Sequence, residues 1–326
     1  MNNNIKKNKD TLIDVDVNKV EITEFKDSHL SEINFKKSEE ALSFLRENNI
    51  LSQFEYNQKL SLLKRKNNNI HVKSKYNPED HKILISVENL TKHYSKRKNP
   101  AVDNISFNIR EGEFHAFIGA NGAGKTTTIK AIVGAYSRYQ GKILIDGQRN
   151  DTVKAKRRIG YVPESAIFPK EFTTRDYLES MSIMSGLSSA DAKKFTTQKL
   201  EELNMLELQH KKPVSFSSGQ KKKILLAQAM VHNPDILIMD EPAANLDPFA
   251  RSELFAILEK YRKDGKSIFI SSHILSEVDK YADTATILDG GKIVFHSKLD
   301  GNENLEELYS KYVILGSVDT NSEAKS

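Results

Sequence analysis

The sequence of 326 residues contains no cysteine. Disulfide bonds and thiolate metal sites are therefore excluded, which fits a protein kept in a reducing cytosol. Long apolar runs are also missing, since no stretch approaches the roughly 18 residues that a membrane-spanning helix needs. The first residues, Met1 to Lys7, have no apolar stretch after their charges, so they do not form a secretory signal. We expect a soluble chain, in which any role at a membrane requires partner subunits.

An excess of one charge sign is likewise absent. The 49 basic and 44 acidic side chains give a net charge of only +5, and both signs are mixed along the chain. So small an excess does not predict nucleic-acid binding. What is present is enough apolar sequence, 38%, to build a hydrophobic core, in a chain long enough for one large domain and a smaller appendage.

Residues 1–80 differ in composition from the rest of the chain, since they are rich in Asn, Lys, Ser and Glu and contain few glycines. We expect residues 1–36 to be poorly ordered and residues 38–66 to form a helical hairpin. The stretch 50–56 resembles the turn and second helix of small SHOCT-like modules, with Leu51 and Phe54 off that pattern. A docking or oligomerisation element and an amphipathic hairpin packed on its own domain remain equally open.

Residues 81–326 alternate between strand and helix patterns and are expected to form a second, larger domain. The first strands, residues 83–87 and 101–109, are typical of an antiparallel sheet. A helical stretch from about residue 173 to 208, in an expected helical subdomain of about 165–215, is followed by buried-type strands separated by helical runs, which predicts a parallel sheet with crossovers. The buried-type strands are Ile236 to Met239, Ser267 to Ser271 and Ala285 to Leu288.

The segment Gly119 to Thr126 matches the phosphate-binding pattern Gly-x4-Gly-Lys-[Ser/Thr] at every fixed position. It lies between a short apolar segment, residues 113–118, and a helix predicted to begin with residues 127–133. This is the strand–loop–helix context in which such a loop binds phosphate through its amides. Lys125 can reach the terminal phosphates, and Thr126 can join a magnesium shell. A chance glycine-rich turn is the alternative, and the motifs that follow disfavour it. The predicted nucleotide-binding residues here are Gly119, Ala120, Asn121, Gly122, Ala123, Gly124, Lys125, Thr126 and Thr127.

Two acids follow the apolar strand of residues 236–239. At the carboxyl edge of a sheet, Asp240 can hold magnesium directly or through water. Glu241, one residue further, points differently and is the candidate general base for an attacking water. Strand-end acids can also simply cap the next helix, and the upstream phosphate loop makes that alternative less favourable.

The segment Phe216 to Gln220 precedes a predicted helix over residues 221–231. Ser217 and Ser218 suit a helix N-cap, and a helix N-terminus favours a phosphate. Taken alone, the segment is an ordinary capped helix start. Its position between Lys125 and the Asp240 strand indicates a functional role.

Together these motifs resemble the nucleotide-binding subunit of an ATP-binding cassette (ABC) transporter. The family's Leu-Ser-Gly-Gly-Gln signature is represented by Phe216-Ser217-Ser218-Gly219-Gln220, and Ser218 adds a side chain near the expected γ-phosphate position. The resemblance implies an α/β fold of the P-loop NTPase class. It comprises a mixed β core, an antiparallel β subdomain and an inserted helical subdomain, here joined to the N-terminal extension.

The resemblance assigns further positions residue by residue. Tyr94 matches the aromatic residue that stacks on adenine, although a lone tyrosine is more often a surface or core residue. Asp247, in Asn245-Leu246-Asp247, matches the loop that crosses to the opposite subunit. His273 matches the γ-phosphate-sensing histidine, although a solitary histidine is usually structural. Glu164 stands where many members have glutamine, and we expect it to be a magnesium ligand.

The implied cofactors are ATP and Mg²⁺, and the implied activity is ATP hydrolysis coupled to transport. The Glu164 loop and the residues around His273 resemble those of cassettes that serve exporters. The resemblance implies a head-to-tail homodimer or heterodimer of cassettes, in which Ser217, Ser218, Gly219 and Gln220 of one subunit act on the partner's nucleotide. Polytopic membrane permease subunits would hold the protein at the cytoplasmic face of the membrane, and no nucleic acid is expected.

Three rival interpretations share the same motifs. A soluble ABC ATPase acting on ribosomes or nucleic acid usually carries two cassettes, whereas this chain has one phosphate loop and one signature. DNA-repair and chromosome ATPases insert a long coiled coil between these motifs, and the gap here is too short. A non-enzymatic regulatory cassette is disfavoured by the intact Lys125, Asp240, Glu241 and His273.

Overall fold

The computed structural model describes residues 43, 76–95, 98–165, 167–300 and 303–315. The chain divides into two compact units, residues 1–72 and 73–326, and almost all described residues belong to the second. The expected disorder of residues 1–36, the helical hairpin at 38–66 and its SHOCT-like resemblance therefore lie outside the described residues, apart from position 43. No helix in the described part of the chain is long and apolar enough to span a bilayer.

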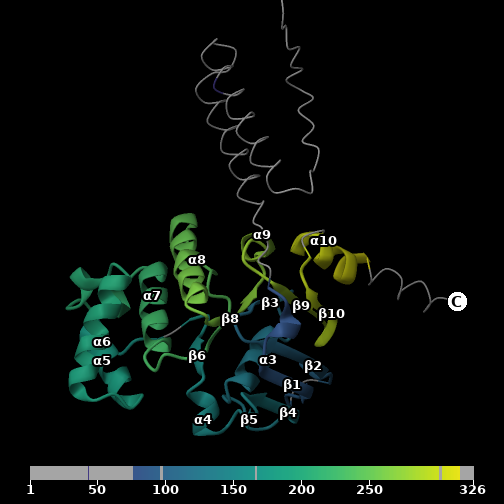
Figure 1. Ribbon diagram of the computed structural model, residues 1–326, viewed down its shortest axis with the longest axis horizontal. Coiled ribbons are helices and arrows are strands. Elements are labelled where there is room, and N and C mark those ends of the chain that lie inside the picture. The colour runs from purple at the N-terminus through teal and green to yellow at the C-terminus, as the bar shows by residue number, and fades with distance from the viewer. Residues whose placement is uncertain (1–42, 44–75, 96–97, 166, 301–302, 316–326) are drawn as a thin grey trace, which may run out of the picture. The chain divides into compact units, whose positions relative to one another are not determined.

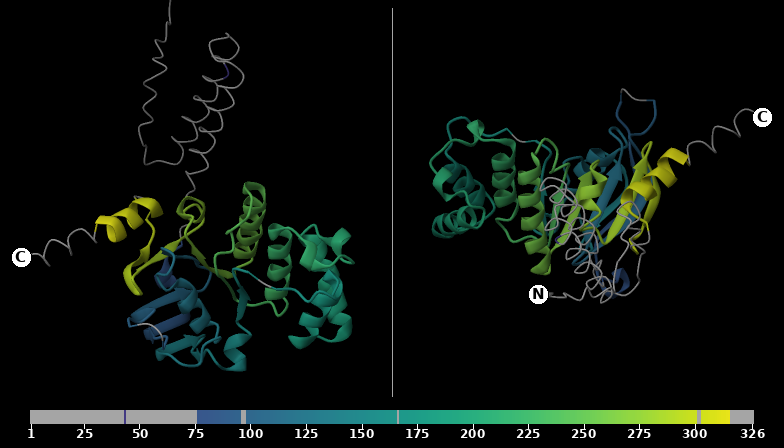
Figure 2. Two further views of the ribbon diagram at one scale, coloured as in Figure 1. Left: turned by 180° about the vertical axis from the view of Figure 1, so that it is seen from behind. Right: turned by 90° about the horizontal axis from the view of Figure 1, so that it is seen from above.

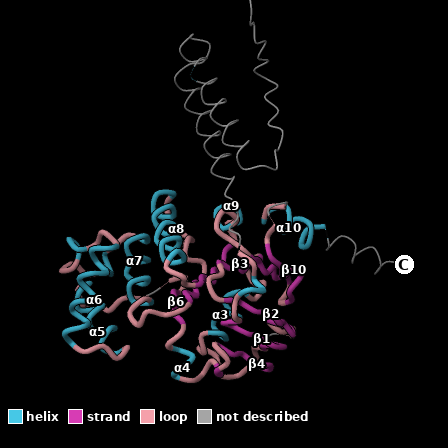
Figure 3. The backbone as a smooth tube through the Cα atoms, viewed as in Figure 1, coloured by secondary structure: helices cyan, strands magenta, loops and turns pink. Residues whose placement is uncertain are grey.

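Within those residues the strands form two sheets (Figure 3). The smaller sheet is antiparallel and has the order β2-β1-β4-β5, as expected for residues 83–87 and 101–109. The larger has the order β10-β9-β3-β8-β7-β6, in which β10 is antiparallel and the others run parallel. The strands are β1 (Ile83–Lys92), β2 (Val102–Arg110), β3 (Phe114–Gly119), β4 (Gln140–Ile145), β5 (Gln148–Arg149), β6 (Ile159–Val162), β7 (Ile236–Met239), β8 (Ser267–Ser272), β9 (Thr284–Asp289) and β10 (Lys292–Lys298).

The helices follow the strands in the crossover pattern that the sequence predicts. Between β6 and β7 the chain inserts α5 and α6, and α7 packs beside them and beside β6; Figures 1 and 2 show these three helices grouped together. The α-helices are α3 (Lys125–Ile132), α4 (Val153–Lys156), α5 (Thr174–Met184), α6 (Ser189–Glu202), α7 (Ser218–Ala229), α8 (Pro248–Lys263), α9 (Leu275–Val278) and α10 (Leu305–Tyr309). Shorter 3₁₀ helices span Pro78–Asp80, Leu206–Leu208 and Pro213–Ser215, and a π-helical turn spans Ser310–Leu315.

The core lies on both faces of the larger sheet, because alternate side chains of a strand point to opposite faces. Phe114, Ala116 and Ile118 of β3 pack into the cluster formed with helices α5 to α8. Phe117 of β3 and Phe269 of β8 point the other way, toward the smaller sheet and α3. Burial on both faces explains why these strands are apolar throughout rather than alternating.

Three expected boundaries differ from the structure. The helical stretch expected over about residues 173–208 contains α5 and α6, and Gly186, with a φ of +101°, follows α5 at the break between them. The helix after the phosphate loop begins at Lys125, two residues earlier than expected, and the signature helix begins at Ser218 rather than Lys221. Tyr76, which lies before the expected domain start at residue 81, is buried and donates a hydrogen bond to the Glu111 carbonyl.

The parallel strands carry the candidate site residues at their carboxyl ends. The phosphate loop follows β3, His273 follows β8, Asp240 and Glu241 follow β7, and Glu164 lies two residues beyond β6. Because β3, β8, β7 and β6 are successive neighbours in the sheet, segments as distant in the chain as the phosphate loop and His273 meet at one edge.

Candidate functional site

The loop between β3 and α3 has a backbone that only small residues permit. Gly122 and Gly124 have φ values of +86° and +110°, in the left-handed region that glycine adopts without strain. A Cβ at Gly124 would also lie 2.6 Å from the Ala101 carbonyl oxygen. Gly124 is the N-cap of α3 and provides no side-chain cap, so the first amides of this helix are left to bind an anion.

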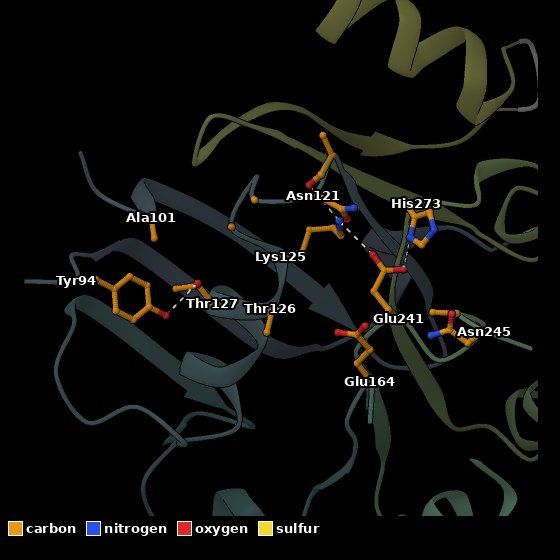
Figure 4. A pocket seen from close by; sticks show the side chains of 14 residues that line it. Tyr94, Ala101, Asn121, Lys125, Thr126, Thr127, Glu164, Glu241, Asn245 and His273 are labelled. Atoms are coloured by element: carbon orange, nitrogen blue, oxygen red, sulfur yellow. Dashed lines mark hydrogen bonds and ion pairs between the residues drawn. The ribbon is translucent and has the colours of Figure 1, made fainter. Parts of the chain in front are cut away.

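A cavity of about 590 Å³ opens beside this loop (Figure 4). Its volume suits a small-molecule ligand, and its polar lining suits one that carries charge. Figure 4 shows Tyr94 at one end and His273 and Asn245 at the other, with Lys125 and Glu241 between them. The lining residues are Tyr94, Ala101, Ala120, Asn121, Gly122, Gly124, Lys125, Thr126, Thr127, Glu164, Glu241, Ala244, Asn245 and His273.

Lys125 is buried at the centre of this cavity. Its ammonium group donates hydrogen bonds to the carbonyl oxygens of Gly119 and Ala120, at 2.6 and 3.2 Å. The same nitrogen lies 3.2 Å from Oε1 of Glu241. The structure therefore brings together a loop cation and a strand-end acid that are 116 residues apart in the sequence.

Glu241 is held in an unusual conformation for a residue with a side chain, with a φ of +44°. Its amide donates to Oγ of Ser271 at 2.9 Å, and Nδ1 of His273 donates to its Oε2 at 2.8 Å. Its Oε1 is buried and has the Lys125 ammonium group as an ion-pair partner at 3.2 Å, but it accepts no hydrogen bond from any residue that the structure describes. That oxygen is chemically suited to accept a proton from a small molecule such as water.

Asp240 lies deeper than Glu241 and is almost completely buried. The hydroxyl groups of Thr126 and Ser271 donate to its Oδ1, at 3.1 and 2.8 Å. Sequence reasoning did not select Ser271, although it contacts both strand-end acids. The available signal was its place at the end of a buried strand, two residues before His273.

The donors expected for magnesium are spread rather than clustered. Thr126 bonds to Asp240, and the exposed Glu164 lines the same cavity. In the described part of the chain, no three His, Cys, Asp or Glu side chains lie close enough to hold a metal ion by themselves. This fits Mg²⁺, which is commonly bound by one or two protein ligands together with substrate phosphates and water.

At its far end the cavity is lined by an aromatic side chain, that of Tyr94. The Tyr94 hydroxyl forms a 3.2 Å hydrogen bond with the Thr127 hydroxyl and donates to the Tyr136 hydroxyl at 3.1 Å. The Lys92 ammonium lies 5.6 and 4.9 Å from the centroids of the Tyr94 and Tyr136 rings, within cation–π range. Sequence reasoning missed Lys92 and Tyr136, since neither belongs to a motif.

The signature residues lie outside this cavity. Ser217 is the N-cap of α7 and forms a capping box with Gln220. The Ser218 hydroxyl donates to the Asn245 carbonyl oxygen of its own subunit at 2.9 Å. Asp247 caps α8 by accepting from the Ala250 amide. Neither residues 217–220 nor Asp247 line the cavity that holds Lys125.

One further cation lies beneath the site. Lys222 of α7 is buried and donates to the carbonyl oxygens of Pro163 and Glu164, at 3.0 and 2.8 Å. Burial lowers the pKa of its ammonium group to about 8, against the opposing attraction of Glu164 and Asp240.

Comparison with known proteins identifies the family. The family model described as ABC transporter matches residues 102–244. An ABC transporter ATP-binding protein of Mycoplasma pneumoniae is 44% identical over 217 residues, which cover 66% of this chain and 67% of that protein. The lantibiotic transport ATP-binding protein SrtF of Streptococcus pyogenes is 36% identical over 234 residues, 71% of this chain and 98% of SrtF.

A solved structure with the same fold contains the products of ATP hydrolysis. It is the dimer of an ATP-binding cassette in a post-hydrolysis state, bound to ADP and Pi. It is 26% identical to this chain, with a TM-score of 0.60, and the match covers 66% of this chain and 99% of the cassette. The chain described here belongs to the family of ABC transporter ATP-binding proteins, and its activity is the binding and hydrolysis of ATP.

Proposed function

We propose that two cassettes close head to tail on ATP, and that this chain uses the closure to energise export through separate membrane subunits. One observation carries the proposal. The phosphate loop and the strand-end acid Glu241 line one cavity, whereas the equally phosphate-suited tip of α7 does not. A second cassette would supply that tip, as the dimeric state of the related cassette supports.

Nucleotide binding is assigned to the residues around the cavity. The Tyr94 ring stacks on adenine, the loop amides from residue 119 to 127 bind the phosphates, and Lys125 exchanges its contacts with loop carbonyls for phosphate oxygens. Thr126, Asp240 and Glu164 are the residues that would hold Mg²⁺. When bound, Mg²⁺ supplies positive charge that offsets the charge developing on the phosphate oxygens.

Hydrolysis is assigned to the Glu241 and His273 pair. Glu241 accepts the proton of the attacking water at Oε1, the carboxylate oxygen that lacks a hydrogen bond in the described structure. His273 holds the other oxygen at 2.8 Å and so fixes the carboxylate orientation. In the closed dimer, the partner's Ser217, Ser218, Gly219 and Gln220 cap the γ-phosphate, and Asp247 contacts the opposite subunit.

The direction of transport is proposed from relatives and from Glu164. SrtF is by its name a lantibiotic transport protein, and the Glu164 loop resembles those of export cassettes. The partners would be polytopic permease subunits, which would place this chain at the cytoplasmic face of the membrane. Copurification of the native complex would identify them.

The Glu241→Gln variant tests the catalytic assignment. Replacing the base by an amide of equal size should leave ATP binding intact, lower kcat by at least about a hundredfold, and trap an ATP-dependent dimer. ATPase rates and gel filtration with ATP or ADP are the measurements. The control is Glu253→Gln, which alters a half-buried α8 acid outside the cavity and should behave as wild type. Near-normal turnover of Glu241→Gln would exclude it as the principal base.

A further inference from the structure

Lys222 is a buried cation whose hydrogen bonds go to main-chain carbonyl groups. Only 6% of its surface is exposed, and it forms no ion pair with any described residue. Its hydrogen bonds go to two successive main-chain carbonyl groups, those of Pro163 and Glu164. Removing an ammonium group from water is costly, and an apolar side chain of similar length would pack here at lower cost. Its presence therefore calls for a reason other than packing.

The two carbonyl groups belong to the segment where the chain leaves β6, at the edge of the cavity. The Glu164 side chain lines that cavity, so the Lys222 contact fixes the main chain from which this carboxylate extends. The charges of Glu164 and Asp240 both attract the Lys222 ammonium group. Lys222 thus supplies a positive charge behind the cavity edge that carries Glu164, and close enough to the buried Asp240 to be attracted by it.

A carboxylate at position 164 has an electrostatic cost that an amide lacks. In a cavity that binds a triphosphate, the charge of Glu164 repels the phosphate oxygens unless a metal ion or a nearby cation offsets it. Lys222 lies on the protein side of the Glu164 segment and does not line the cavity, so it can offset this charge without contacting the ligand.

We infer that Lys222 is a positioning residue for ATP hydrolysis, which orients Glu164 at the cavity edge and offsets its negative charge. The inference rests on the proposed function of the cavity. Glu164 and Lys222 then act together at a position where many members of the family have a single neutral glutamine.

A purely structural tether would act differently, and the neighbouring lysine provides the comparison. The Lys223 ammonium donates to the Leu203 carbonyl at 3.3 Å and lies 3.0 Å from the Glu253 carboxylate, so it ties α7 to the end of α6 and to α8. Lys223 is also one residue along the same helix, and its polar partners in the described structure, Leu203 and Glu253, do not line the cavity. Lys223→Met is therefore the matched control for Lys222→Met.

The experiment is a double-mutant cycle on the purified full-length chain. The variants are Lys222→Met, Glu164→Gln and the double variant, and kcat and KM for ATP are measured with Mg²⁺ present. We expect Lys222→Met to lower kcat about tenfold with KM changed less than about twofold, because Lys222 acts through Glu164 and not on ground-state binding. In the Glu164→Gln background, the same substitution should lower kcat by less than about twofold. Lys223→Met should retain wild-type kcat.

Two additional variants keep the test decisive. Lys222→Arg retains charge and donors and should restore more than half of the kcat lost in Lys222→Met. Lys222→Gln retains a neutral donor group without the charge. It replaces Lys222→Met if that variant does not fold, since methionine leaves two carbonyl groups without a donor. Equal losses of kcat in both Glu164 backgrounds would overturn the inference. A wild-type chain that hydrolyses no ATP would instead contradict the proposed function itself.

Discussion

At the scale of single residues, the two strand-end acids owe their arrangement to one hydroxyl group. Ser271 of β8 donates to Asp240 and accepts the amide hydrogen of Glu241. The Glu241 φ of +44° is an uncommon backbone conformation that needs such support from its surroundings. Ser271 thus keeps one carboxylate turned toward Thr126 and the next toward His273 and Lys125.

Ser271→Ala should therefore lower kcat about tenfold, because it removes a donor to Asp240 and leaves the buried Glu241 amide without an acceptor. Ser272→Ala is the matched control, since Ser272 is the next residue of β8 and its hydroxyl hydrogen-bonds to Ile274 rather than to either acid in the described structure. Steady-state ATPase rates of both variants are compared at a temperature where both are folded. Equal activities of the two alanine variants would show that the Ser271 contacts do not matter for turnover.

At the scale of secondary-structure elements, helix N-termini separate into two kinds. Helices α5, α6, α7 and α8 all carry a side-chain cap, whereas α3 begins at Gly124 with none. An uncapped N-terminus retains free amides and a positive dipole end, which suits phosphate binding. The α7 cap uses Ser217 and Gln220, so the signature residues also stabilise their own helix.

Ser217→Ala and Ser188→Ala separate these two roles of a cap. Each removes an N-cap hydroxyl, from α7 and α6 respectively, and each should lower the free energy of unfolding by about 1 kcal/mol. Only Ser217→Ala should also lower the ATPase rate, because of these two helices α7 alone meets a nucleotide in the proposed dimer. Urea denaturation and ATPase assays measure the two effects. If Ser217→Ala lost stability but kept full activity, the role of its hydroxyl at the partner's nucleotide would be refuted.

At the scale of the whole molecule, the proposed dimer makes the ATP site of one chain incomplete without its partner. The cavity contains Lys125, Glu241 and His273, and the α7 tip lies outside it. The Ser218 side chain, which departs from the family's glycine, bonds within its own subunit to Asn245, a residue that lines the cavity. The added hydroxyl is therefore accommodated inside one subunit.

Complementation between two inactive variants tests the composite site. Lys125→Ala removes the loop cation, and Ser218→Glu places an anion on the exposed tip of α7. Each alone should be nearly inactive. An equimolar mixture should recover up to about a quarter of wild-type ATPase activity, because half of the dimers are mixed and each has one complete site. A mixture as inactive as its components would argue against a head-to-tail homodimer.

Features that depend on neighbouring residues were predictable from the sequence. The phosphate loop, its flanking strand and helix, the Ser217 cap and the acids after β7 follow from local backbone chemistry. The mixed sheet, the antiparallel subdomain and the inserted helices likewise agree with expectation. The division of the expected helical stretch into α5 and α6 was not specified from the sequence, because one glycine in a helix pattern does not by itself show where a helix ends.

The sequence by itself determined the chemistry of this protein: a phosphate loop, two acids, a histidine and a serine-capped helix, each encoded within a few residues. Only the tertiary structure decided which of them meet. The order β3-β8-β7-β6 brings Lys125 to Glu241, Ser271 to Asp240 and Lys222 to the Glu164 segment, and keeps the α7 tip out of the cavity. Local propensity acts over a few residues, whereas these contacts depend on how distant strands pair and which face each helix covers.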